Sequence, residues 1–416
     1  MKPARPLLVV GAGIAGITAA LEAAEAGAEV ILVEREPTVG GRVLRSHQYF
    51  PKLCPPSCGM EINLRRLEGT PRVRVITSAR IAAAERTDAG WKVTLAVDPA
   101  FVNSRCTCCG DCEQACTTTV PDPFNLARST VKAIRLPHLH AWPRRYVFDR
   151  AACSDAEAAA IAAACRYGAV DLAATPTAET VEVGAVVLAT GWRPYPAERL
   201  PELGGGILQD VIANVELERL ASPAGPTQGR ILRPSDGRPP SRVAFVQCAG
   251  SRDVNHLPYC SSVCCLASLK QALYVKEQLP EAEVSIYSID LRTPGRNEDL
   301  LRKVAALAGV RLVKGKVGAV QAAGSSLRLR VEDVEAERIV EAEADLVVLA
   351  TGMVPSTVGD ELPLLTRRDE DGFALDDLEA GIAVAGVARR PEDVAASVRD
   401  ATAAAARAIA AAARGR

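Results

Sequence analysis

Cysteine is the residue type whose number and spacing point most directly to chemistry in this chain. The 416 residues include 13 cysteines, and these fall into tight groups rather than being spread along the sequence. Without a convincing signal peptide, grouped cysteines favour metal ligation over disulfide bonds. Because the chain has only four histidines, we expect all-thiolate iron–sulfur sites rather than mixed zinc sites.

One cysteine group, in residues 106–116, has the spacing C-x2-C-x2-C-x3-C of the bacterial ferredoxin run, with Thr117 in place of the usual proline. A decayed second half retains Cys153 and Cys165. Exchange of the fourth ligand between two such halves predicts a [4Fe–4S] cluster on four thiols: Cys106, Cys109, Cys112 and Cys165. Cys116 as the fourth ligand is the competing assignment, and a zinc knuckle is the alternative for the group.

A further group lies between a predicted strand, Val243–Gln247, and a predicted helix, Val263–Gln278. It has the spacing C-x11-C-x3-C-C and comprises Cys248, Cys260, Cys264 and Cys265. A nicotinamide-binding βαβ unit would carry a glycine loop at this turn, and the loop is absent, so we expect no nicotinamide site. A second [4Fe–4S] cluster suits the position, because the helix dipole stabilises an anionic cluster. Buried cysteines without metal are the alternative.

The N-terminal elements predict a dinucleotide-binding βαβ unit. A strand over Leu7–Val10 leads into the motif G-x-G-x-x-G and an alanine-rich helix, and a second strand over Glu29–Val33 ends at Glu34. In such a unit the glycines allow a tight turn, close approach to a pyrophosphate and helix–strand packing, while the acidic residue binds a ribose hydroxyl.

Features further along the chain favour FAD over NAD. Gly41 and Arg42 follow the second strand, and strand-plus-turn segments recur at 186–191, 346–352 and 382–386. Their order resembles the flavoprotein disulfide reductase superfamily with two dinucleotide folds, although Val387 replaces its usual aspartate. The resemblance implies FAD contacts at Gly11, Gly13, Ala15, Gly16, Glu34, Arg35, Gly41, Arg42, Thr190, Gly191, Gly352 and Gly386.

The expected fold class is α/β, with a Rossmann-like FAD domain, a degenerate ferredoxin-like insertion and a second βαβ domain. The expected division assigns 1–100, 172–240 and 345–416 to the FAD domain, 101–171 to the insertion and 241–344 to the second domain. With 49 basic and 50 acidic residues, the chain lacks the basic surface that nucleic acid requires. No apolar run reaches the ~20 residues of a membrane span.

The cysteine spacing around Cys260 resembles the A subunit of heterodisulfide reductases. Several stretches resemble more closely the A subunit of the quinone-interacting membrane-bound oxidoreductase (Qmo); they are 48–56, 231–237, 255–260, 292–296 and 386–391. This resemblance implies a cytoplasmic FAD and iron–sulfur subunit that relays electrons between the quinone pool and adenylylsulfate reductase in dissimilatory sulfur metabolism. It also implies a second flavo-iron–sulfur subunit, a membrane quinone-reactive subunit through which the chain meets the membrane, and candidate contacts with adenylylsulfate reductase or a second copy of the chain.

Two features separate competing functions. Lys270 resembles a family lysine near the flavin, which implies that it tunes the flavin potential, whereas an exposed helix lysine is the alternative. Cys54 and Cys58 could form the dithiol of a self-contained disulfide or polysulfide reductase, although Pro55 and Pro56 interrupt a helical pair. A scaffold that keeps the flavin fold without metal is the non-enzymatic alternative.

Overall fold

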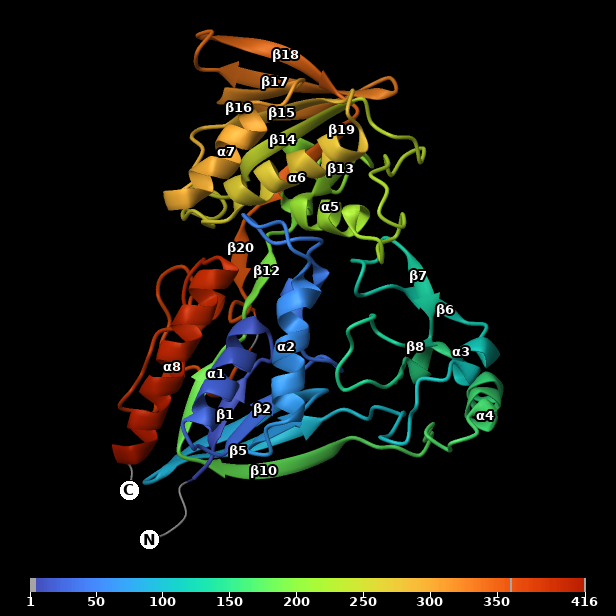
Figure 1. The fold of residues 1–416 in the computed structure, drawn as a ribbon, viewed down its shortest axis with the longest axis vertical. Helices are drawn as coiled ribbons and strands as arrows, with labels where there is room; N and C mark the ends of the chain where they lie inside the picture. The colour runs from blue at the N-terminus through green and yellow to red at the C-terminus, as the bar shows by residue number, and fades with distance from the viewer. Residues whose placement is uncertain (1–4, 360, 415–416) are drawn as a thin grey trace.

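The computed structural model describes residues 5–359 and 361–414, which form three lobes (Figure 1). The first lobe is built on a five-stranded parallel sheet in the order β21-β11-β1-β2-β3. Its strands are β21 (Ile382–Val384), β11 (Ala185–Leu188), β1 (Leu7–Val10), β2 (Val30–Val33) and β3 (Val73–Ile76).

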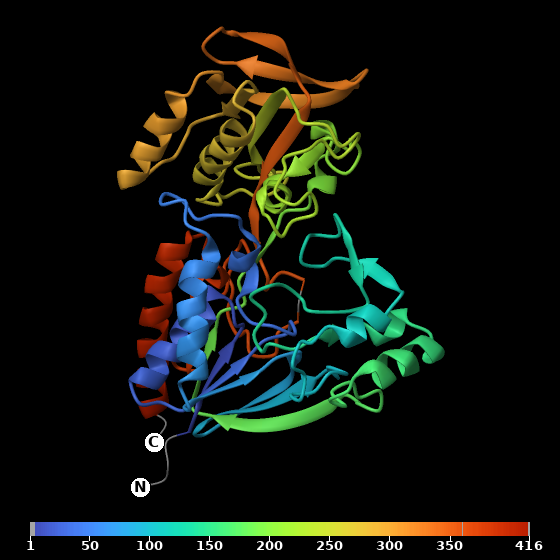
Figure 2. The ribbon, with the colours of Figure 1, turned by 45° about the vertical axis from the view of Figure 1, so that its right-hand side comes forward.

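Both faces of this sheet are covered, which is why β1, β2 and β11 are continuous apolar runs. Leu7 and Val9 point into a core shared with α1, α2 and α8, whereas Leu8 and Val10 point toward a three-stranded antiparallel sheet. Both ribbon views place α8 beside α1 (Figures 1 and 2). The covering elements are α1 (Ile14–Glu25), α2 (Pro56–Glu68), α8 (Val394–Arg414), β4 (Ala79–Thr87), β5 (Gly90–Val97) and β10 (Thr177–Val183).

The second lobe contains a seven-stranded sheet in the order β13-β19-β14-β15-β16-β17-β18. Helices α5, α6 and α7 pack on one face of its parallel part. Its elements are β13 (Val211–Ala213), α5 (Asn214–Ala221), β14 (Arg242–Ala249), α6 (Cys264–Gln278), β15 (Glu283–Ser288), α7 (Glu298–Ala305), β16 (Val310–Ala323), β17 (Ser326–Asp333), β18 (Arg338–Ala344) and β19 (Leu346–Thr351).

Two strands of this sheet correct the expected domain division. We expected 211–213 and 346–351 to lie with the FAD domain, but β13 pairs with β19, and β19 pairs with β14. The apolar run of β19 fits a central strand of either parallel sheet, so the sequence alone does not choose between them. The chain crosses between the lobes just beyond, where β12 (Trp192–Pro194) pairs antiparallel with β20 (Met353–Pro355) (Figure 1).

The third lobe, residues 101–171, has a small core of its own that includes three cysteine side chains, Cys112, Cys116 and Cys153. Its elements are α3 (Asp111–Ala115), β6 (Thr119–Pro121), β7 (Thr130–Lys132), β8 (Ile134–Arg135), β9 (Val147–Phe148) and α4 (Asp155–Ala164). Short 3-10 helices complete the described structure: η1 (Gly41–Arg45), η2 (Arg150–Ala152), η3 (Ala197–Arg199), η4 (Pro201–Leu203), η5 (Gly295–Asn297) and η6 (Gly386–Ala388).

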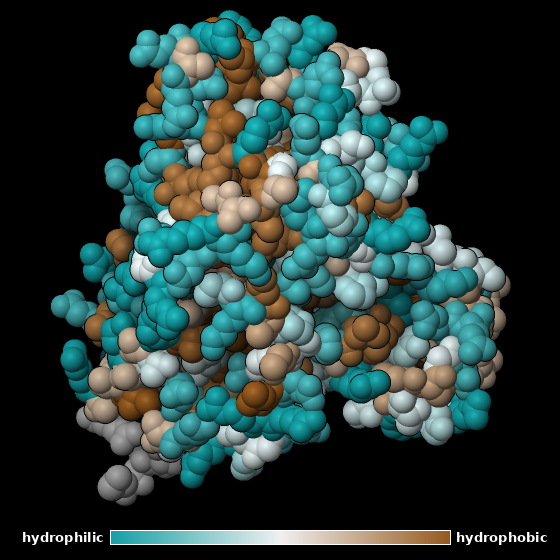
Figure 3. All heavy atoms as spheres, turned by 45° about the horizontal axis from the view of Figure 1, so that its top comes forward, coloured by the Kyte–Doolittle hydropathy of each residue, from teal (hydrophilic) through white to brown (hydrophobic). Residues whose placement is uncertain are grey.

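The face of the molecule drawn in Figure 3 is mostly polar, but apolar side chains gather in a band in its upper part. Among the described residues, no helix combines the length and the apolar character needed to cross a bilayer.

Candidate cofactor sites

A cavity of about 770 Å³ lies beyond the carboxyl ends of β1, β2 and β11, where α/β sheets bind nucleotides. Nine of the residues predicted to contact FAD line it: Gly11, Gly13, Ala15, Glu34, Arg35, Gly41, Arg42, Thr190 and Gly191. The Thr190 hydroxyl is buried without a hydrogen-bond partner within the described chain, as expected of a group that meets a ligand.

The glycine motif creates the close packing that this cavity needs. A Cβ on Gly11, at φ +98°, would lie 2.4 Å from the Ala189 carbonyl oxygen, and a Cβ on Gly16 would lie 1.7 Å from the Gly11 oxygen. Gly13 has room beside it, with Gly41 Cα 4.0 Å from the position of its Cβ. Gly11 and Gly16 therefore fix the turn, while Gly13 leaves open the space through which a pyrophosphate would approach.

Glu34 is held at the end of β2 by two backbone N–H groups. Its carboxylate accepts hydrogen bonds from Ala12 N (2.7 Å) and Glu36 N (3.0 Å). Burial raises its pKa, although these hydrogen bonds oppose the shift. A carboxylate has about four lone-pair sites, so acceptor capacity remains for ribose hydroxyls.

Three predicted FAD contacts lie outside the cavity lining. Gly16 packs the helix onto the turn, and Gly386 packs against Ala15 while its N–H donates to Asp400 (2.9 Å). Gly352 packs against the cysteine turn of the second lobe, where a Cβ would meet Ser251 Oγ at 2.2 Å.

Sequence reasoning missed the part of the cavity that the insertion supplies. Phe124 and His138 line it, with their rings stacked 4.7 Å apart, and Thr38 Oγ1 lies 3.2 Å from His138 Nε2. Burial first, then His140, Arg45 and Arg219, lower the His138 pKa to about 4. No motif marks these residues, because they approach β2 only through the tertiary fold.

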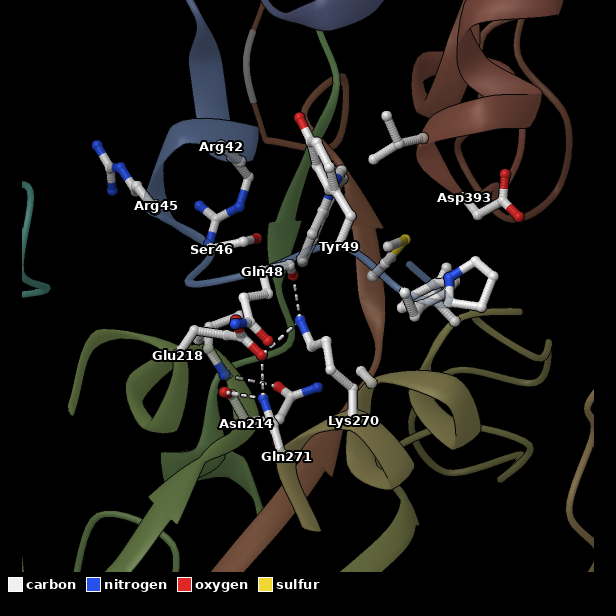
Figure 4. Close-up of a pocket in the computed structure, with 18 of the residues that line it drawn as sticks. Arg42, Arg45, Ser46, Gln48, Tyr49, Asn214, Glu218, Lys270, Gln271 and Asp393 are labelled. Carbon is white, nitrogen blue, oxygen red and sulfur yellow. Dashed lines mark hydrogen bonds and ion pairs between the residues drawn. The ribbon is translucent and has the colours of Figure 1, made fainter. Parts of the chain in front are cut away.

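A second cavity, of about 330 Å³, adjoins the first and shares Arg42, Arg45 and Trp192 with it. Helix α6 supplies Lys270 to its wall (Figure 4). Lys270 is 4% exposed, lies 2.8 Å from Glu218 Oε1 and donates to the Gln48 carbonyl oxygen at 2.7 Å. The exposed-lysine alternative is therefore wrong.

Further hydrogen bonds hold the carboxylate of the Lys270–Glu218 ion pair in place. Gln271 Nε2 donates to Glu218 Oε1 (2.7 Å), and His47 N donates to Glu218 Oε2 (2.8 Å). The buried Gln271 Oε1 has no hydrogen-bond partner within the described residues, so an acceptor in the cavity wall is left for a ligand.

Arg42 brings positive charge to the boundary between the cavities. Its guanidinium lies over the Trp192 ring, 4.6 Å from the centroid, and no described carboxylate forms an ion pair with it. Burial, together with repulsion from Arg45 and Arg35, lowers its pKa to about 9. An anionic ligand would relieve this imbalance, which fits a dinucleotide cofactor.

The four predicted thiols of the second lobe gather at the N-terminus of α6. Burial, then repulsion from the thiolate forms of Cys248, Cys265 and Cys260, raises the Cys264 pKa. Ionising all four thiols therefore requires compensating positive charge, which a metal cluster supplies. Val263 and Ala267, on either side of Cys264 in sequence, line the second cavity.

The insertion brings together Cys106, Cys109, Cys112 and Cys165. Burial raises the Cys112 pKa to about 11, and the other three thiols add to the shift. Cys165 Sγ accepts from Ala169 N at 3.2 Å, and N–H groups of residues 167–170 outweigh burial and lower its pKa. This arrangement favours Cys165 over Cys116 as the fourth ligand.

The distances between sulfur atoms within each group of four predicted ligand thiols, here called a tetrad, test the zinc alternative. Tetrahedral zinc with Zn–S of about 2.3 Å requires sulfur atoms about 3.8 Å apart. In the described chain, neither tetrad contains three thiols whose sulfur atoms all lie within 4.8 Å of one another. The thiol positions in the described chain therefore do not match a single tetrahedral zinc site.

The other cysteines divide by exposure. Cys54 and Cys58 are exposed at the start of α2 and line neither cavity, and Cys108 lies beside the first tetrad with its thiol toward the Arg144 carbonyl oxygen (3.5 Å). Cys116 and Cys153 are buried together in the core of the insertion, which also contains Cys112.

Comparison with known proteins agrees with this geometry. Residues 6–56 match the family model for FAD dependent oxidoreductases. The chain is 36% identical over 406 residues to the iron–sulfur A subunit of the CoB–CoM heterodisulfide reductase of Methanocaldococcus jannaschii, covering 93% of this chain and 61% of the relative. It is 35% identical to one of the corresponding A subunits of Methanopyrus kandleri, covering 98% and 64%. The chain thus spans less than two thirds of the length of these relatives.

The fold resembles that of thioredoxin reductases. The T. acidophilum enzyme superposes with a TM-score of 0.54 at 13% identity, covering 98% of each chain, and the Lactococcus lactis enzyme with 0.52 at 14%, covering 99% of each. These matches confirm the predicted α/β class with Rossmann-like domains. The sequence relatives confirm the resemblance to the A subunits of heterodisulfide reductases, and the two relatives named here are iron–sulfur subunits.

Proposed function

We propose that this chain, a homologue of the A subunits of heterodisulfide reductases, is a FAD- and iron–sulfur-containing electron-transfer oxidoreductase subunit. FAD binds in the 770 Å³ cavity with its flavin end toward Arg42 and Trp192, where the two cavities meet. Bound flavin exchanges electrons in pairs or singly, so it converts between two-electron donors and one-electron clusters.

The observation that carries the proposal is the continuity of α6. Cys264 and Cys265 are the first residues of this helix. Lys270, which lines the second cavity, lies on the same helix six residues beyond Cys264. At 1.5 Å per residue this separation is about 9 Å along the axis. A cluster on the four thiols is therefore held close to the flavin by one rigid element.

In this proposal, Lys270 is a tuning residue. A buried cation beside the cavity favours added negative charge there, and Glu218 holds the ammonium group in place. The second cluster, on Cys106, Cys109, Cys112 and Cys165, extends the relay toward the face of the insertion.

The finer proposal follows the resemblance to the Qmo protein. The chain passes electrons between the quinone pool and adenylylsulfate reductase, as a cytoplasmic subunit held near the membrane by a flavo-iron–sulfur partner and a quinone-reactive membrane protein. The apolar band in Figure 3 supports a partner-bound chain, because such surfaces mark protein interfaces. Reduced protein should then be reoxidised by adenylylsulfate reductase with its substrate; no reoxidation above the buffer rate would contradict this role.

The self-contained dithiol reductase that was the alternative gains nothing from the geometry. Cys54 and Cys58 line neither cavity, so neither thiol faces the expected flavin position. A chain that reduced small disulfides unaided, and lost that activity on Cys54→Ser, would restore that alternative.

Partial reduction tests the relay itself. One electron equivalent per chain, added anaerobically, should distribute between flavin and clusters, with flavin absorbance and the cluster EPR signal changing together. In Cys264→Ser the distribution should shift, because the cluster nearest the flavin is damaged. Flavin reduction with no cluster signal at any level of added reductant would contradict the relay.

A further inference from the structure

Three ligand-type side chains of the insertion remain unused by the proposed clusters. Donor atoms of Cys116, Cys153 and Glu157 all lie within 4.8 Å of one another, and they form the one such group of three or more found in the described chain. The two cysteines are 1% and 7% exposed.

We propose that Cys116, Cys153 and Glu157 form a mononuclear site for a thiophilic divalent cation of the zinc class, separate from both iron–sulfur tetrads. Zinc takes thiolate and carboxylate ligands together, and a fourth position is filled by water or a carbonyl oxygen. The Thr118 carbonyl oxygen lies 3.3 Å from Cys116 Sγ and is one protein candidate for that position.

The Glu157 carboxylate is oriented before any metal binds. Its Oε1 accepts hydrogen bonds from Thr117 N (2.7 Å), Thr117 Oγ1 (2.9 Å) and Thr118 N (2.8 Å). Its Oε2 accepts only from Thr118 Oγ1, at 2.6 Å, and so keeps a free lone pair. Such hydrogen bonds hold a ligating carboxylate ionised and fixed.

The spacing of the donors suits one ion rather than a cluster. Tetrahedral zinc sets its sulfur ligands about 3.8 Å apart. The donor atoms of Cys116, Cys153 and Glu157 lie within 4.8 Å of one another, which is compatible with one ion, and among the described residues these three side chains alone contribute. A four-iron cluster needs four protein ligands, one more than these three side chains provide.

The site would stabilise the insertion near its proposed cluster. Cys116 ends α3, Cys153 precedes α4, and Glu157 lies in the first turn of α4, whose C-terminal cap is Cys165. A metal at this point ties the two halves of the insertion together. It thereby fixes the helix that presents Cys165 to the first tetrad.

Metal analysis of the intact, anaerobically purified chain tests the proposal. About one zinc per chain should be present or bind on titration with zinc alone, and Co²⁺ should give thiolate-to-cobalt absorption bands. Cys116→Ser and Cys153→Ser should abolish binding, and Glu157→Gln should weaken it at least tenfold. Cys108→Ser makes the same chemical change in the same insertion and should bind zinc normally, and iron content should not fall in Glu157→Gln.

Three results would overturn the proposal. One is a wild-type chain that binds no zinc and shows two free, titratable thiols at these positions. Another is a chain lacking two thiols until reductant is added, which would indicate a Cys116–Cys153 disulfide. The third is extra iron that is lost in Cys116→Ser, which would indicate a retained cluster. If the serine variants fail to fold, the cobalt spectrum of the wild-type chain and the zinc affinity of Glu157→Gln still test whether the site exists.

Discussion

At the scale of single residues, Gly13 is a position where a substitution should affect FAD binding but not folding. A Cβ at this position has space, whereas larger side chains would enter the cavity. Gly13→Val should therefore fold and lose FAD. Gly59→Val is a matched control, since Gly59 also has open space but lies in α2 away from both cavities. Normal FAD absorbance in purified Gly13→Val would refute the loop assignment.

Lys270 couples stability to flavin potential. Lys270→Met leaves the buried Glu218 carboxylate without its cation, which should cost about 3–5 kcal/mol of unfolding free energy. The flavin potential should also become more negative. The double variant Lys270→Met/Glu218→Gln should recover much of the stability, because no unpaired charge remains.

Lys276→Met is the control for this pair, since Lys276 contacts only carbonyl oxygens, among them that of Ala282 at 2.8 Å. Its cost should be about 1 kcal/mol or less. Denaturant titration and spectroelectrochemistry give both quantities. An unchanged potential in Lys270→Met would limit Lys270 to a structural role.

His138 predicts a specific acid sensitivity. Its pKa is about 4 in the fold against 6.5 as the ordinary value, so between these pH values the unfolded chain binds a proton that the folded chain does not. Stability should fall as pH falls from 6.5 toward 4, by up to about 3 kcal/mol from this group. Unfolding measured across that range should show a shallower loss in His138→Gln than in the wild-type chain. Parallel curves for wild type and His138→Gln would contradict the burial effect.

At the scale of elements, the cysteine turn and the glycine turn belong to different sheets. Cys264→Ala should therefore lose about one cluster's iron, near four atoms per chain, while FAD stays bound. Cys108→Ala should retain both. Iron and FAD lost in parallel from Cys264→Ala would show that the two sites are not separate.

The elements also show what sequence could and could not predict. The sequence predicts closely the βαβ unit at the N-terminus and the helix after the cysteine turn, because glycines and apolar runs are local signals. The sheet to which β19 belongs, and the approach of His138 to Thr38, depend on pairing between distant segments. No local pattern specifies such pairing, so these features needed the structure.

At the scale of the whole molecule, three lobes meet around two adjoining cavities. The first lobe supplies the nucleotide turn, the second supplies α6 and its thiols, and the insertion closes the first cavity with Phe124 and His138. The proposed electron transfer would therefore use residues from all three lobes.

Anaerobic quantification of iron and flavin, with EPR after dithionite reduction, tests this account most directly. The account predicts about eight cluster irons and one FAD per chain, with EPR signals from two [4Fe–4S] clusters. Iron-free protein that retains a full complement of FAD would contradict it.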